Sequence, residues 1–317
     1  SAIAFSESNG ISHDPVELAE MMAEGERYVG TQGGGMDQAI CILATAGSAL
    51  KIDFFPLRHR IVPFPEDCSI VVAHSLIRAA KTENALVHYN RRPAECRLAT
   101  LLINRLHHPT PPIRRLGDLP STGLLEQFPS IDGFVDATFP ERSYSLARIA
   151  TIAGIPEATV VGQCLMTRSG VPMPEPDDGF LLASRVRHIL SEAERVEKSC
   201  NALLRLDAAA FGKFMNESHE SCRPRYGISQ VERDMLSSIM RDAGALGARL
   251  TGAGFGGCAI ALVRDADIDH VIASVNERYY GAYIPRTHPG MTVKGLAFAL
   301  KPAGGAVSSP LPSPAQP

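Results

Sequence analysis

The sequence has little of what a nucleic-acid or membrane partner would require. Its 31 lysines and arginines nearly balance 34 aspartates and glutamates, and the net charge of -3 provides no basic field for nucleic acid or an anionic membrane surface. No apolar run approaches the roughly 18 residues that a membrane-spanning helix needs. The first residues have neither the basic region nor the apolar core of a secretory signal, and no methionine precedes Met21. We therefore expect neither nucleic acid nor membrane as a partner, and the oligomeric state stays open.

Paired and metal-binding cysteines are also missing. The seven cysteines are an odd number, lie far apart, and form no C-x-x-C pair and no zinc-type spacing with histidine. The adjacent pair His107 and His108 lies in a proline-rich stretch and matches no ligand spacing. We therefore expect reduced thiols in a cytoplasmic protein, without a metal site built from protein ligands.

The sequence does contain the patterns of a folded chain that mixes helices and strands. Its 317 residues are 45% hydrophobic, which predicts one large domain or two. Asp14, Pro15 and Glu17 have the residue types and spacing of a helix start, so we expect a helix over 15–28. The absence of strict βαβ alternation favours an α+β fold. Further strands are expected at 50–54, 69–73, 258–263 and 291–300, and further helices from 36, from 94 to Pro109, and over 181–206, 229–244 and 268–279.

Three local expectations follow from these patterns. The periodicity of the 181–206 helix places Arg185 on its polar, outward face. Ser229 and Glu232 have the spacing of a capping box for the helix that follows. Residues 302–317 contain five prolines and no charge, which predicts a disordered tail.

Asp37 follows a glycine-rich loop at a predicted helix start. Gly33, Gly34 and Gly35 allow the backbone to approach a ligand closely, and the helix behind them offers free N–H groups and the positive end of its dipole. An ionised Asp37 in that first turn can hold or deprotonate an attacking hydroxyl. Acids are also common in first helical turns for stability alone, so the pattern by itself leaves both interpretations open.

A second glycine cluster lies at residues 251–257 and formally contains G-x-G-x-x-G. A dinucleotide site requires a helix directly behind these glycines, whereas residues 258–263 predict a strand. A turn between two strands can still present amides to a phosphate, or it can be purely structural. Two isolated residues are weaker candidates: Lys81 for a nucleotide and Tyr89 for a sugar, although a surface lysine and a half-buried tyrosine are the ordinary interpretations.

Four segments together are far more specific than any one of these features. They occur in the order found in galactokinases: residues 28–38, 89–99, 215–219 and 249–258. Over roughly residues 15–306 the chain resembles the eukaryotic branch shared by galactokinase and N-acetylgalactosamine kinase. That branch belongs to the superfamily of galacto-, homoserine, mevalonate and phosphomevalonate (GHMP) kinases.

The resemblance implies a two-lobed α+β fold with the active site between the lobes. The N-terminal lobe would be like domain 2 of ribosomal protein S5, incomplete here and represented by residues 1–68. Residues 69–301 would form the C-terminal lobe, and 302–317 would be the tail.

The resemblance also implies ATP-dependent phosphorylation of the anomeric hydroxyl of galactose, with Mg²⁺, to give galactose 1-phosphate and ADP. Asp37 matches the catalytic aspartate, while Gly33, Gly34, Gly35 and Tyr89 match sugar contacts. The nucleotide-side matches are Lys81 and the third family motif, represented by Thr251, Gly252, Gly254, Gly256 and Gly257.

The departures from the family concern activity. Relatives carry a Gly-Glu-His-Thr-Asp-Tyr signature, a catalytic arginine and a Ser/Gly-rich phosphate loop, none of which occurs in these 317 residues. We therefore expect the chain alone to be a poor kinase with exposed apolar surface. Pro93 also interrupts a stretch that is helical in relatives. A non-catalytic galactose-sensing paralogue and N-acetylgalactosamine kinase stay open as alternatives, while an NAD-binding oxidoreductase rests only on the glycines at 252–257.

Overall fold

The structure is a computed structural model that describes residues 2–27, 34–77, 83–167, 170–254, 256–291 and 296–307. For residue 27 and residues 83–89 it describes the backbone alone. Every structural statement below refers to these residues. None of the described helices is both long and apolar enough to cross a membrane.

The N-terminal part consists of three helices followed by a hairpin, and its core is small. Asp14 Oδ1 accepts hydrogen bonds from the backbone N–H groups of Val16 and Glu17, which confirms the expected helix start. Ala19, Ala39 and Leu57 are the buried residues of the core cluster between the second and third helices and the hairpin turn. The elements are α1 Ala2–Ser8, α2 Pro15–Arg27, α3 Met36–Leu43, β1 Ser48–Asp53 and β2 Arg58–Pro63.

The second part is built on a four-stranded antiparallel sheet with the strand order β4-β5-β3-β6. Alternate residues of β3 enter different cores: Val71 and Ala73 pack with α10 and α11, whereas Cys68 packs with α9. The strands are β3 Cys68–His74, β4 Gly247–Leu250, β5 Cys258–Arg264 and β6 Ala297–Leu300. The helices that cover them are α9 Ala208–Ser221, α10 Val231–Asp242, α11 Ile268–Ser274 and α12 Ile284–Thr287, with π-helical residues 275–283 before α12.

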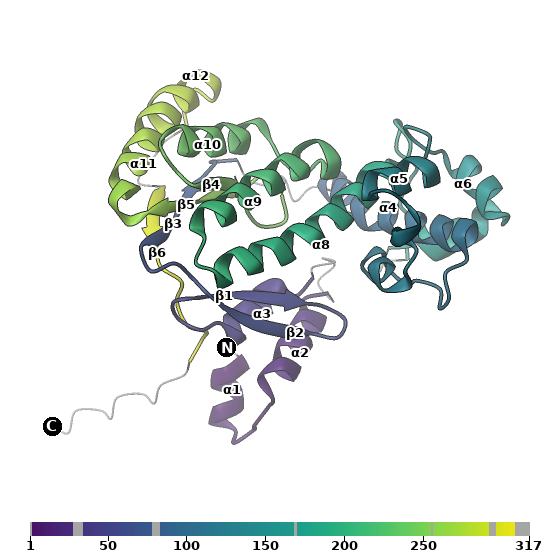
Figure 1. Cartoon of the computed structure of the whole chain (residues 1–317), viewed down its shortest axis with the longest axis horizontal. Helices are drawn as coiled ribbons and strands as arrows, with labels where there is room; N and C mark the ends of the chain where they lie inside the picture. The colour runs from purple at the N-terminus through teal and green to yellow at the C-terminus, as the bar shows by residue number, and fades with distance from the viewer. Residues whose placement is uncertain are drawn as a thin grey trace.

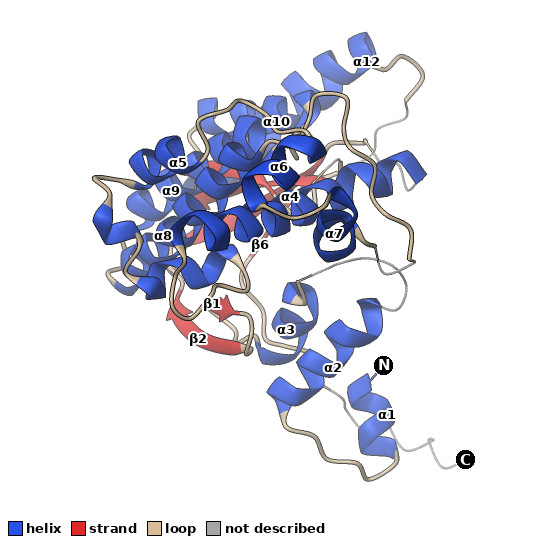
Figure 2. Ribbon diagram, turned by 90° about the vertical axis from the view of Figure 1, so that its right-hand side faces the viewer, coloured by secondary structure: helices blue, strands red, loops and turns tan. Residues whose placement is uncertain are grey.

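A helical bundle projects from one side of the sheet (Figure 1). Its apolar core includes Leu98 and Leu102 of α4, Phe134 of α5, and Val186 of α8. The far end of α8 leaves the bundle and packs Leu203 against the β1–β2 hairpin. Figure 2 shows this hairpin and α1–α3 apart from the larger sheet, which is covered by helices. The bundle helices are α4 Glu83–His107, α5 Ile131–Thr138, α6 Leu146–Ala153, α7 Glu157–Val160 and α8 Leu182–Leu204.

The α+β class is confirmed, but several local expectations are wrong. Arg185 is buried, with only 2% of its surface exposed, because it pairs with a carboxylate on a neighbouring helix. Helix α4 begins at Glu83 and continues through Pro93, so this proline does not interrupt it. The expected capping box is absent, because α10 begins behind Gln230 and the Ser229 hydroxyl donates to Asp234 instead.

The beginning of the expected tail also differs from the prediction. Residues 302–306 form backbone hydrogen bonds with residues 41–47. Residues 308–317 lie outside the described part of the chain. The expected domain limits, 1–68 and 69–301, stay a prediction.

Candidate active site

The start of α3 places Asp37 in its first turn. Gly35 is the N-cap residue and has a φ of 83°, in the left-handed region that glycine adopts without strain. A Cβ atom at Gly35 would lie 2.7 Å from Cβ of Ala23, so the loop also approaches α2 closely. The Asp37 side chain is exposed and forms no hydrogen bond or ion pair with another described residue. A substrate hydroxyl can therefore reach this carboxylate.

A cavity of about 360 Å³ lies beside Gly34 and Gly35. Its lining is largely apolar and includes Met21 and Phe55, while the Glu20 carboxylate in its wall already accepts a hydrogen bond from the Leu57 backbone N–H. Asp37 is not part of the lining. The cavity therefore borders the glycine loop but does not enclose the Asp37 carboxylate.

The second glycine cluster connects β4 to β5 as a tight turn. Gly252, Gly254, Gly256 and Gly257 all have positive φ values, and the Thr251 N–H donates to the Cys258 carbonyl across the turn. A strand rather than a helix follows the glycines, as the sequence predicts. The turn therefore lacks the helix that a dinucleotide-binding loop requires.

Two neighbouring segments hold this glycine turn. A Cβ atom at Gly254 would lie 2.6 Å from Cβ of Ile228. On the other side, the Gly257 N–H donates to the Ile77 carbonyl at 3.0 Å, and the Ser75 N–H donates to the Gly257 carbonyl at 2.8 Å. The turn is thus fixed beside the end of β3.

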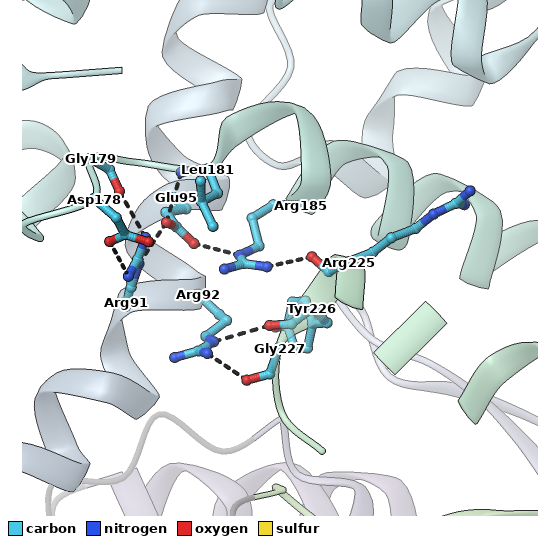
Figure 3. Close-up of polar contacts among 10 residues, drawn as sticks. All are labelled: Arg91, Arg92, Glu95, Asp178, Gly179, Leu181, Arg185, Arg225, Tyr226 and Gly227. Atoms are coloured by element: carbon cyan, nitrogen blue, oxygen red, sulfur yellow. Dashed lines mark hydrogen bonds and ion pairs between the residues drawn. The ribbon is translucent and has the colours of Figure 1, made fainter. Parts of the chain in front are cut away.

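A buried ion network joins α4 to α8 (Figure 3). Glu95 is fully buried, and its Oε1 accepts hydrogen bonds from Nε of Arg91 at 2.8 Å and from the Leu181 N–H at 2.9 Å. Its Oε2 accepts from Nε of Arg185, which is also buried and donates through NH1 to the Arg225 carbonyl. Because every partner is hydrogen-bonded, the network keeps its charges inside the protein without an unpaired carboxylate.

Arg92, on the same helix, holds the segment that precedes Ile228. Its Nε donates to the Tyr226 carbonyl at 3.1 Å, and its NH2 donates to the Gly227 carbonyl at 2.6 Å (Figure 3). Burial, together with the charge of Arg185, lowers the pKa of Arg92 to about 10, so the side chain remains charged at neutral pH. The next residue, Ile228, is the one that packs on Gly254. The helix that contains Tyr89 is therefore connected through Arg92 to the glycine turn.

The residues Asn216 and His219 of α9 support the strand that enters the turn. Oδ1 of Asn216 accepts from the Ala248 N–H at 2.8 Å, and Nδ1 of His219 accepts from the Leu250 N–H at 3.2 Å. These N–H groups belong to β4, an edge strand whose outer side has no strand neighbour. Burial lowers the pKa of His219, which favours the neutral ring that this contact requires. Asn216 and His219 thus hold the strand that enters the glycine turn.

The structure describes some of the predicted site residues and not others. Gly33, Lys81 and the Tyr89 side chain lie outside the described part. The first glycine loop and Asp37 share the start of α3, whereas the second glycine cluster belongs to the larger sheet. No hydrogen bond joins these two groups among the described residues. The buried arginine network was missed by sequence reasoning, although the i,i+4 spacing of Arg91 and Glu95 was a signal for one of its pairs.

Among the described residues, no group of three or more histidine, cysteine, aspartate or glutamate side chains could hold a metal ion.

Comparison with known proteins identifies related sequences and a related fold. The profile of the family described as GHMP kinases C terminal matches residues 201–281, which include α9, α10 and the glycine turn. A galactokinase from Dictyostelium discoideum is 32% identical over 96% of this chain and 65% of its own length. A galactokinase from Roseiflexus sp. (strain RS-1) is 31% identical over 84% of this chain and 55% of its own length.

The crystal structure of Lactococcus lactis galactokinase complexed with galactose has a similar fold. Its TM-score is 0.68 at 24% identity, and the match covers 98% of this chain and 64% of that chain. The likeness confirms the expected fold. The chain spans less than two thirds of the length of each of these three proteins.

Proposed function

The chain belongs to the galactokinase group of the GHMP kinase family, and from this premise we propose that its protein transfers a phosphoryl group from ATP to the anomeric hydroxyl of galactose. The products are galactose 1-phosphate and ADP. The observation that carries the proposal is the exposed, unpartnered carboxylate of Asp37 at a glycine-shaped helix start, in a chain 32% identical to a galactokinase.

Asp37 acts on the nucleophile in this proposal. Its carboxylate accepts the hydrogen bond of the anomeric hydroxyl and orients the hydroxyl oxygen toward the phosphorus atom, or takes the proton as the bond forms. Phosphoryl transfer needs little covalent help, so positioning and charge neutralisation dominate its rate. Because Asp37 has no described partner, binding substrate does not require an existing ion pair to break. The free N–H groups at the start of α3 favour negative charge nearby.

The other predicted site residues form two groups, one for the sugar and one for the nucleotide. Gly33, Gly34, Gly35 and Tyr89 are assigned to the sugar. Lys81 and the glycine turn are assigned to the nucleotide. Gly252 and Ala253 of the turn are exposed, and their N–H groups have no described backbone partner, so the turn fits a phosphate or the loop that binds one.

Arg92 supports the placement of the sugar group relative to the nucleotide group. It fixes the helix that contains Tyr89 to the turn at residues 226–227, and through Ile228 to Gly254. ATP supplies the phosphoryl group when bound, and Mg²⁺ neutralises phosphate charge. The residues of this chain then have to hold the hydroxyl and the phosphate in line.

The test is sugar-dependent ADP release by the intact natural protein that contains these residues. We expect release with galactose and none with methyl galactoside, whose anomeric oxygen has no proton and is already substituted. Equal rates with the two sugars would contradict anomeric phosphorylation. N-Acetylgalactosamine, measured in parallel, decides which of the two sugars is preferred.

Calorimetric titration of the same protein with galactose and with ATP separates an enzyme from a sensor. Binding of both ligands without ADP release would refute the kinase proposal and favour the galactose-sensing alternative. For the 317-residue chain assayed alone we expect slow turnover, because it contains neither the arginine nor the Ser/Gly-rich loop of its relatives. Loss of one cationic partner of the transferred phosphoryl group costs about 10³-fold or more.

A further inference from the structure

The segment at residues 301–306, here called the strap, leaves the larger sheet and crosses to the N-terminal helices. In Figure 1 it is the yellow chain that descends from β6 toward α3. Its first residue, Lys301, is anchored through Nζ, which donates to the carbonyls of Glu66 at 2.6 Å and Cys68 at 2.8 Å. Nζ also pairs with the carboxylate of Asp265 at 2.7 Å. One end of the strap is therefore fixed to the strands of the sheet.

The other end of the strap covers the C-terminal end of α3. The Gly305 N–H donates to the Ala44 carbonyl at 2.8 Å, and the Ala306 N–H donates to the Cys41 carbonyl at 2.6 Å. The last carbonyls of a helix have no partner within the helix, so the strap provides the hydrogen bonds that α3 itself cannot. A third bond, from the Gly47 N–H to the Pro302 carbonyl, holds the loop behind α3.

Helix α3 depends on such support because it is short and sparsely packed. It has eight residues, and isolated helices shorter than about 12 residues are marginal in water. Ala39 is its only fully buried residue, whereas Met36 and Ile40 are 53% and 38% exposed. Asp37 lies about one helical turn from Cys41, so a shift at the strap contacts reaches the carboxylate.

Gly305 allows the strap to lie this close to the helix. A Cβ atom there would stand 2.8 Å from the Ile42 carbonyl oxygen and 3.1 Å from the Cys41 carbonyl oxygen. Backbone atoms cannot move aside as the end of a flexible side chain does, so any larger residue would push the strap away. The neighbouring Gly304 has no such constraint, because a Cβ atom there would meet only Ala46 N, at 3.9 Å.

We propose that Gly305 is a positioning residue for the kinase reaction: it lets the strap cap α3 and so fixes the Asp37 carboxylate relative to the sugar hydroxyl. This inference rests on the proposed function. The strap places part of the catalytic geometry in a segment that the sequence pattern assigned to a disordered tail.

The experiment compares Gly305→Ala with the matched control Gly304→Ala. Hydrogen exchange measured by mass spectrometry should show amides of α3 exchanging about 10-fold faster in Gly305→Ala and unchanged in Gly304→Ala. In the intact natural protein, Gly305→Ala should lower kcat by about 10- to 100-fold, because a displacement of about 1 Å can cost that much. The KM for ATP should stay unchanged. Gly304→Ala should keep the wild-type kcat.

The outcomes separate the strap from the proposed function. Wild-type kcat and wild-type exchange of α3 in Gly305→Ala would overturn the inference, as would equal losses in both glycine variants. If the wild-type protein phosphorylates no sugar, the proposed function fails, while the exchange of α3 still tests the strap. Should Gly305→Ala not fold, Lys301→Met releases the anchor without adding an atom near α3, and it should also raise α3 exchange and lower kcat. Unchanged values in that variant would contradict the proposal.

Discussion

The N-terminal elements have a much smaller buried core than the larger sheet with its helical bundle. In the first, the core cluster that holds two helices and a hairpin turn has three buried residues among those the structure describes, and Phe5, Met21 and Phe55 are 66%, 50% and 57% exposed. The second has two extended apolar cores, and a buried ion network joins α4 to α8. Asp37 belongs to the first region and the glycine turn to the second. In this contrast the Asp37 carboxylate depends on contacts from outside its own region, whereas the glycine turn depends on its neighbours in the sheet and bundle.

Removing the buried carboxylate should give the largest loss of stability. In Glu95→Ala, Arg185, which is only 2% exposed, loses its carboxylate partner, and Arg91 loses one of its two carboxylate partners. Breaking such a buried pair costs about 3 to 5 kcal/mol of unfolding free energy, measurable by urea denaturation. The matched control is Glu194→Ala in α8, where an exposed pair with Lys198 contributes less than about 0.5 kcal/mol. Similar losses in the two variants would show that the buried network has no special role.

A smaller effect should follow from crowding the glycine turn. Gly252→Ala isolates the cost of a positive φ, since a Cβ atom there meets nothing within 4 Å, and we expect about 1 kcal/mol. Gly254→Ala adds the collision with Ile228 and should cost about 3 kcal/mol in the same denaturation experiment. If the two variants lose equal stability, the packing between the turn and Ile228 does not hold the turn.

The pH dependence of stability should reveal the buried ring of His188. It lies 2.9 Å from the Ser221 hydroxyl and stacks on Tyr226, and burial lowers its pKa to about 4. The unfolded chain, with a pKa near 6.5, binds this proton first, so stability is lost as pH falls from about 6.5 toward 4. We expect a loss of about 2.5 kcal/mol between pH 7.5 and 4.5.

The matched variant His188→Asn removes that titration. Between pH 7.5 and 4.5 its unfolding free energy should therefore fall by about 2.5 kcal/mol less than that of the wild-type protein. Because carboxylates titrate in this range in both proteins, the quantity to measure is the difference between the two pH profiles. Parallel profiles would rule out the buried neutral ring.

The sequence predicts local features well where neighbouring residues alone determine them. Asp14 and Pro15 mark the start of α2, and the apolar run from Cys258 marks β5. Prediction from sequence fails where a partner far away in the chain determines how a residue is placed. Helical periodicity turns Arg185 outward, but the pattern contains no information about Glu95, 90 residues away, which draws the charge inward. A proline-rich composition predicts disorder at 302–306, yet hydrogen bonds to α3 order the strap.

The features of the candidate site are likewise of two kinds, those that local sequence predicts and those that depend on distant contacts. Residue types and spacing identify Asp37 and both glycine clusters as candidates, because glycine before a helix start and between strands has local causes. They do not reveal that Arg92 of α4 holds residues 226–227 next to Ile228 and Gly254, since the hydrogen bonds of Arg92 join segments more than 130 residues apart.

The most direct test of the proposed role of Asp37 is galactose-dependent ADP release by Asp37→Asn beside Asp269→Asn in the intact natural protein. Asp269 is an exposed acid in the first turn of α11, so it matches Asp37 in residue type and helical position. We predict that Asp37→Asn loses about 10²- to 10⁴-fold in kcat while still binding galactose, and that Asp269→Asn keeps wild-type turnover. Wild-type turnover by Asp37→Asn would contradict the account.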